Sequence, residues 1–424
     1  MTVDHPLPAT SPDRPSVKEH KGLLVGAAAM MTSGVLTTFL SPLLAVSFAR
    51  EFDFGIAHAG LLVSGGLGSV ALSAFAVLPF LPRLDRRAVG IGGALVAAAG
   101  LAVTGFASTF GVVLALQITI GLGAGLCYAC ANSALAFARR PERAFSIVTI
   151  TWMLAGAAML ALGPTLHTMW PKVGICLGLA VAELVCVIFM TRLCDVRTLA
   201  KVEPDAALLE PSRRSDSIDD AQPTTTTGSL RVGGPAMMLV VAAWLIQGGN
   251  LMVWTFAESI GEHAALSAQS TANFLGLSQL MGLVGAGVTL AFGAKINKMF
   301  LVVPAVLTLA IGNLFVGTAT NPPQFIVGFL AVSVAYFCLI PLLLALAAEL
   351  DTHSGQLVVL VGAGALVAGG IAPAIGGWIA GTAEHWPRLG VTALAAVLLA
   401  LPLMVAPVRV ARRRMAMAGM VSQD

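Results

Sequence analysis

Long apolar runs, separated by short polar segments, make up most of this chain. Each run has about 20 residues, the length that a helix needs to cross roughly 30 Å of hydrocarbon. The pattern predicts twelve membrane-spanning helices, at residues 22–49, 59–80, 89–107, 110–137, 146–166, 173–191, 235–257, 271–293, 299–318, 324–348, 355–380 and 389–408. The expected fold class is therefore an all-α membrane protein, because helices satisfy their own backbone polar groups in lipid.

One polar segment is much longer than the others. Residues 194–234 are rich in Asp, Glu, Ser, Thr and Pro and contain too few apolar residues to pack, so we expect a flexible linker. The linker divides the spans into six and six. The expected organisation is an N-terminal tail, a six-helix bundle, the linker, a second six-helix bundle and a basic tail, at residues 1–21, 22–193, 194–234, 235–408 and 409–424.

Charged residues are few and unevenly placed. They make up 11% of the chain, against 57% hydrophobic residues. When the spans are counted off, 21 of the 24 Lys and Arg residues fall on one side of the membrane. Positive charge in short loops marks the cytoplasmic side, so both termini are expected in the cytoplasm and the protein in the cytoplasmic membrane. No basic patch exists apart from these loops, so no nucleic-acid partner is expected.

Short motifs recur in the two groups of spans. Leu84-Asp85-Arg86 follows the second span, and Ile296-Asn297-Lys298 follows the eighth. Trp170-Pro171-Lys172 precedes the sixth span, and Trp386-Pro387-Arg388 precedes the twelfth. Matches in the same order at nearly constant offset indicate an internal repeat. Parallel six-span repeats place a binding site between the two halves, near the middle of the membrane.

With these features the chain resembles the major facilitator superfamily over nearly its whole length. The resemblance implies two six-helix bundles and a conformational latch in the repeated loops, formed here by Asp85, Arg86, Asn297 and Lys298. The alternative is that Arg86 and its neighbours only orient the chain. Gly121-Leu122-Gly123-Ala124-Gly125 also fits the family, but Gln117 stands where drug-efflux antiporters commonly carry an Arg. These glycines permit close helix contact.

Polar residues inside the spans are the candidates for substrate binding, because they are costly in lipid. Helical periodicity places Gln117, Tyr128 and Asn132 on one face, and Gln247, Asn250, Trp254 and Glu258 on another. The resemblance implies that spans 1, 4, 7 and 10 line a central cavity. The predicted substrate-binding residues are Gln117, Tyr128, Asn132, Trp152, Gln247, Asn250, Trp254 and Tyr336. The alternative is that the amides join helices within one half.

Two acidic residues are candidates for proton coupling or gating. Glu183 lies near the middle of the sixth span, where a carboxyl group is expected to be protonated or paired. A neutral Glu183 hydrogen-bonded inside its own half is the alternative. Glu258 lies at the outer end of the seventh span, where we expect water to reach it. Two roles of Glu258 are left open: it gates the path of the solute, or it is only a solvated residue at a helix end.

No Lys or Arg lies inside a span, which argues against a strongly anionic substrate. We therefore expect a secondary active transporter that moves a small neutral or amphipathic organic solute by alternating access, coupled to a proton gradient. The alternatives are uptake of a small organic acid and a receptor that does not transport. An enzyme is not expected, because the spans hold no His-Glu-x-x-His or paired-Asp motif. The lipid bilayer is the other expected partner, and we expect no cofactor, no metal site and a functional monomer.

Overall fold

The computed structural model describes residues 17–81, 83–136, 141–193, 234–292, 296, 298–350, 356–381 and 385–421. These residues form helices joined by short turns, and none of them is in a β-strand. The linker predicted at residues 194–234 lies almost entirely outside the described residues.

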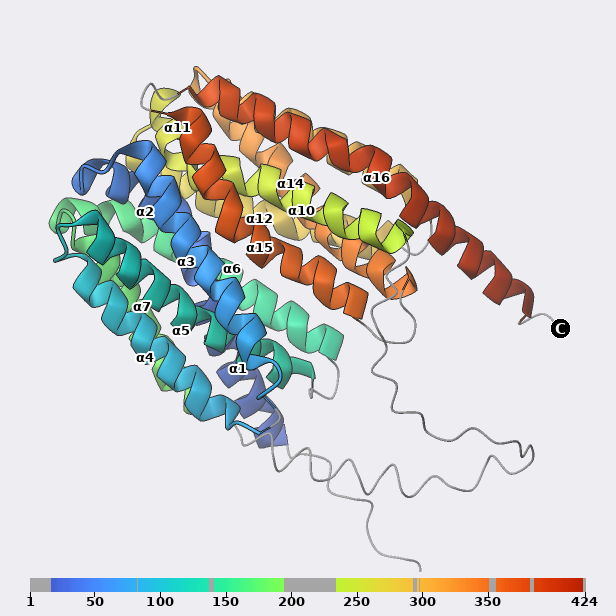
Figure 1. Ribbon diagram of the computed structural model, residues 1–424, viewed down its shortest axis with the longest axis horizontal. Coiled ribbons are helices and arrows are strands. Elements are labelled where there is room, and N and C mark those ends of the chain that lie inside the picture. The colour runs from blue at the N-terminus through green and yellow to red at the C-terminus, as the bar shows by residue number, and fades with distance from the viewer. Residues whose placement is uncertain are drawn as a thin grey trace, which may run out of the picture.

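The helices form two bundles that lie side by side, one coloured blue to green and the other yellow to red (Figure 1). The first bundle, the N half, contains α1 (Val17–Phe39), α2 (Ser41–Val46), η1 (Ser47–Glu51), α3 (Gly55–Val77), α4 (Arg86–Thr104), α5 (Phe110–Ala136), α6 (Pro141–Met169) and α7 (Gly174–Met190). The second bundle, the C half, contains α10 (Gly234–Thr255), α11 (Ala257–His263), α12 (Ala268–Phe292), α13 (Met299–Gly317), α14 (Pro322–Leu350), α15 (Gln356–Ala380) and α16 (Trp386–Val421).

Eleven of the described helices are long and apolar enough to cross a membrane, and α7, with 17 residues, is a shorter apolar helix. Large apolar side chains such as Leu72, Phe106 and Trp378 are exposed on the outside of the bundles, where lipid can cover them. The protein is therefore a multi-pass membrane protein, and the predicted all-α fold of two six-helix bundles is confirmed.

The first and seventh spans are each interrupted near one end. A single helix was expected over residues 22–49, but α1 stops at Phe39 and α2 begins at Ser41, followed by the π-helical turn η1. Pro42 in the first turn of α2 has no backbone N–H to continue the ladder of α1. Likewise, α10 stops at Thr255 and α11 follows after Phe256, whose φ and ψ are −105° and 14°. Hydropathy continues across both interruptions, so it could not reveal them.

Two other helices run into segments that were expected to be tails. Helix α1 already begins at Val17, and α16 continues to Val421. The basic residues after position 408 therefore stand on the last turns of a long helix.

The glycine run of α5 brings three helices close together. A Cβ atom on Gly121 would lie 2.0 Å from the carbonyl oxygen of Gly66 in α3, and one on Gly123 would lie 2.3 Å from that of Gly93 in α4. Any side chain at these positions would push the helices apart. The run is a packing surface, as the sequence predicted.

The two halves meet most closely at the end that holds α2, η1 and α11, which we call the closed end. Helices α3 and α15 approach there through small residues: a Cβ atom on Gly60 would lie 2.3 Å from the carbonyl oxygen of Pro373. The backbone N–H of Ala374 donates to Ser64 Oγ (2.8 Å), and Gln269 of α12 donates to the carbonyl oxygen of Ala161 in α6 (2.8 Å).

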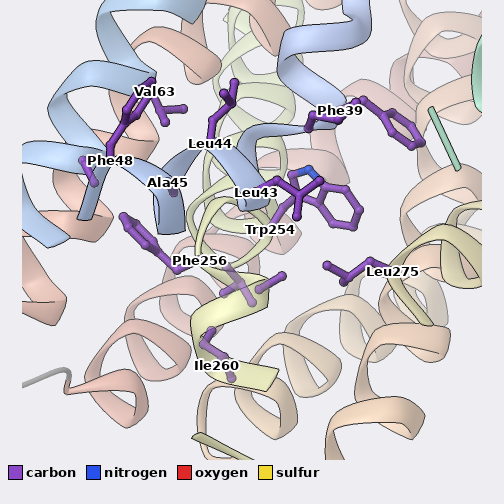
Figure 2. Packing of buried hydrophobic residues seen from close by; sticks show 14 of the residues in the cluster. Phe39, Leu43, Leu44, Ala45, Phe48, Val63, Trp254, Phe256, Ile260 and Leu275 are labelled. Atoms are coloured by element: carbon purple, nitrogen blue, oxygen red, sulfur yellow. The ribbon is translucent and has the colours of Figure 1, made fainter. Parts of the chain in front are cut away.

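Apolar side chains and one ion pair add to the closed end. Leu43 and Phe48 from the interrupted first span belong to the same buried cluster as Phe256 and Ile260 from the C half, and Figure 2 shows these side chains. Nearby, Arg50 of η1 forms an ion pair with Glu262 of α11. The closed end is thus sealed by side chains that belong to different halves.

Candidate functional site: a cavity between the halves

A cavity of about 340 Å³ lies between the two halves. Helices α1, α3, α5 and α6 of the N half line it, together with α10, α12, α14 and α15 of the C half. Its size lies in the range of small-molecule sites.

An aromatic floor separates the cavity from the closed end. Phe39 is the last residue of α1, and its ring lies 5.4 Å from that of Trp152 in α6 and 5.9 Å from that of Trp254 in α10, both with edge-to-face geometry. Figure 2 shows Phe39 and Trp254 beside each other. Trp254 also lies 6.2 Å from Phe329 of α14. Edge-to-face pairs are favourable beyond their burial, so the floor joins the halves.

The polar groups of the residues that line the cavity are hydroxyls, amides and the indole N–H groups of Trp152 and Trp254. The N half contributes Thr38, Tyr128 and Thr149, and the C half contributes Gln247, Asn250, Gln279, Ser333 and Tyr336. Among the described residues that line the cavity, none is an Asp, Glu, Lys, Arg or His. The hydroxyl of Tyr336 donates a hydrogen bond to Gln247 Oε1, which holds α14 to α10.

Six of the eight residues predicted to bind substrate line this cavity. They are Tyr128, Trp152, Gln247, Asn250, Trp254 and Tyr336. They come from four helices, and the predicted faces of α5 and α10 are thus partly in the cavity.

Gln117 and Asn132 do not line this cavity. Gln117 shares the face of Tyr128 but stands eleven residues, or about 16 Å, nearer the closed end, where α1 and α3 cover α5. It is buried beside Thr37 at a small pocket of about 10 Å³. Asn132 donates to the backbone oxygen of Tyr128 on its own helix (2.8 Å).

Glu183 is fully buried inside the N half, away from the cavity lining. It lies on α7 and accepts a hydrogen bond from Ser33 Oγ of α1, while its Oε1 atom has no partner. The structure therefore places this carboxyl group between two helices of one bundle.

Glu258 occupies a different position from the one expected. Water was expected to reach it at the end of the seventh span, but its side chain is buried, with 4% exposure. The interruption at Phe256 puts Glu258 on α11, so it no longer continues the stripe of Gln247, Asn250 and Trp254. The expectation of a solvated helix end was wrong, because α11 packs against α2 and α12 at the closed end and Glu258 is buried there.

The residues predicted to form a latch lie at the end of the bundles opposite the closed end. Asp85 caps α4 by accepting from the backbone N–H of Arg87 (2.9 Å), and Arg86 donates to Ser133 of α5 (2.9 Å). Lys298 forms an ion pair with Glu349 at the end of α14. Each of these contacts joins residues of the same half: the first two are in the N half and the third is in the C half. Asn297 lies outside the described residues.

Several lining residues were not among the predicted ones. Thr38 and Phe39 line the cavity from the last turn of α1, although no residue of the first span was among the predicted ones. Gln279 lines the cavity from α12. Thr149 and Phe337 carried no signal, since an isolated hydroxyl or ring in a span is common.

The sequence profile of the Major Facilitator Superfamily matches residues 23–356 of the chain. No curated protein sequence matches it. Solved structures with the same fold include the following three. A bacterial homologue of the human lysosomal transporter Spinster, in an inward-facing and unoccupied conformation, has 13% identity over 95% of this chain and 98% of that chain, with a TM-score of 0.65. A D-xylose–proton symporter has 14% identity over 92% and 97%, with a TM-score of 0.62. A peptide transporter has 16% identity over 92% and 95%, with a TM-score of 0.68.

Proposed function

This chain belongs to the Major Facilitator Superfamily, and on that premise we propose that it is a secondary active transporter of a small neutral or amphipathic organic solute, coupled to a proton gradient. It works by alternating access in the cytoplasmic membrane, with both termini in the cytoplasm. The side bias of Lys and Arg supports this orientation. In that orientation, the described conformation is sealed at the outer end.

The observation that carries the proposal is the uncharged cavity between two halves that are sealed together at one end. A solute held between the halves changes sides when they rock about it. The closed end must then separate, and the Arg50–Glu262 pair and the aromatic contacts of Phe39 must break. The latch loops at Asp85 and Lys298 must approach each other in the opposite conformation.

Glu183 is the candidate for proton coupling. Its carboxyl group is buried in membrane-spanning helices with a hydroxyl as hydrogen-bond partner, so its protonation changes the forces between α1 and α7. Helix α1 ends at Phe39 in the floor of the cavity. Protonation of Glu183 can therefore shift α1 and the aromatic floor, although Glu183 itself does not contact the solute.

Solute counterflow in proteoliposomes tests the function. Because the similar folds include a D-xylose–proton symporter and a peptide transporter, the panel contains labelled sugars and short peptides, with dicarboxylates as the charged contrast. We expect exchange of at least one uncharged solute, lowered about tenfold or more by Trp254→Ala, because the floor loses a buried ring. Trp378→Ala is the control, since Trp378 is 79% exposed. Exchange of dicarboxylates alone, or no effect of Trp254→Ala, contradicts the proposal.

A further inference from the structure

The side-chain amides of the described cavity lining all come from the C half. Gln247 and Asn250 stand on α10, and Gln279 stands on α12. The N half faces them with the rings of Phe39 and Trp152 and with hydroxyls. Aromatic rings stand on both walls, since Trp254, Tyr336 and Phe337 belong to the C half. Among the described lining residues, side-chain amides stand on the C-half wall alone.

The carbonyl ends of these amides are not free for a solute. Gln247 Oε1 accepts the hydroxyl of Tyr336. Asn250 Oδ1 and Gln279 Oε1 are shielded from solvent and have no hydrogen-bond partner. In the described part of the chain, the amide nitrogens of the three residues donate no hydrogen bond and are not among the shielded atoms without a partner, so they are open to the cavity. What this wall presents to the cavity is thus N–H donors, two on each amide nitrogen.

A solute in this cavity meets unpaired donors and no fixed charge. An uncharged oxygen acceptor, such as a carbonyl, ester or ether, can pair with the amide N–H groups. A solute that only donates hydrogen bonds leaves those groups without a partner once water is displaced, which is costly. A site built to pair with a polar group rejects the analogue that lacks it.

This inference rests on the function proposed above. We infer that the cavity selects uncharged solutes that carry both an oxygen acceptor and an apolar ring or chain. Gln247, Asn250 and Gln279 determine this specificity by donating to the acceptor. Trp152, Phe39 and Trp254 pack against the apolar part.

Two bicyclic probes of similar size separate the alternatives. 1-Indanone carries a carbonyl acceptor and no donor, and indole carries an N–H donor and no oxygen acceptor. Their binding to detergent-purified protein is measured as a concentration-dependent rise in thermal stability. We expect 1-indanone to bind about tenfold more tightly than indole. Asn250→Leu and Gln279→Met should each weaken the binding of 1-indanone about three- to tenfold and leave the binding of indole unchanged.

Asn313→Leu is the matched control, because Asn313 is a buried amide of the C half, on α13, that does not line the cavity. It should change the binding of neither probe. Gln279→Met decides the outcome if Asn250→Leu lowers the yield of folded protein. Equal or tighter binding of indole, no binding of either probe, or insensitivity of 1-indanone to both substitutions overturns the inference.

The counterflow assay is independent of these results. Exchange of solutes that only donate hydrogen bonds overturns the specificity and leaves the transporter intact, whereas absence of any exchange overturns the proposed function itself.

Discussion

The two halves of this protein share one six-helix plan but place their polar side chains differently. In the N half, Glu183 and Gln117 are buried within the bundle, and Asn132 bonds to its own helix. In the C half, Gln247 and Asn250 face the cavity between the halves. The difference separates two tasks. Under the proposed function, the N half keeps its buried carboxyl group away from the solute, and the C half supplies amides to bind it.

The largest effect is expected where α3 of the N half packs against α15 of the C half. Gly60→Leu places a side chain where a Cβ atom would already lie 2.3 Å from the carbonyl oxygen of Pro373. Overpacking of this kind costs about 1–3 kcal/mol, so the population of the sealed conformation should fall about fivefold to 150-fold relative to the open one. Counterflow and accumulation should both fall by a similar factor.

The control for that variant is Gly92→Leu, since a Cβ atom on Gly92 would meet nothing within 4 Å. It should transport like the parent protein. Normal transport by Gly60→Leu would mean that α3 and α15 do not need to approach each other during the cycle.

Glu183→Gln tests the task assigned to the N half. The substitution keeps the shape and the hydrogen-bonding capacity toward Ser33 but removes the titrating group. We expect loss of proton-driven accumulation and normal counterflow exchange, measured on the same proteoliposomes with and without a pH gradient. Ser33→Ala, which keeps the carboxyl group, should still accumulate solute. Normal accumulation by Glu183→Gln contradicts the coupling role.

The smallest effect is expected from the ion pair that crosses the closed end. The side chains of Arg50 and Glu262 are 48% and 26% exposed, and exposed pairs contribute about 0–1 kcal/mol. Arg50→Glu should therefore change the counterflow rate no more than several-fold. Adding Glu262→Arg restores the pair with reversed charges and should return the rate toward that of the parent. A double variant slower than Arg50→Glu argues that the pair has no part in sealing this end.

The sequence was sufficient to predict the spans, because twelve apolar runs are long enough to cross a bilayer and the linker divides them evenly. It could not assign the polar faces fully. Membrane helices are apolar on nearly every side, so a polar stripe can face a cavity or a neighbouring helix with the same periodicity. Gln117 and Tyr128 share a face of α5, yet only Tyr128 reaches the cavity, because α3 covers the helix at the depth of Gln117.

The interruptions of the first and seventh spans were the other feature beyond sequence reasoning. Pro42 marks the first, but no proline marks the second at Phe256. Both occur at corresponding places in the repeat, which suggests that packing across the closed end sets the break in α10. The misplacement of Glu258 follows directly from this missed interruption.

Alternating access is the central claim, and paired distance measurements test it most directly. Spin labels at Lys172 and Arg388 report on the closed end, and labels at Arg87 and Ile296 report on the opposite end; all four positions are exposed and come in pairs from the two halves. With a solute that exchanges in the counterflow assay, we predict that the first distance distribution gains a longer component and the second gains a shorter one. Distances that stay unchanged, or that lengthen together, would contradict the account.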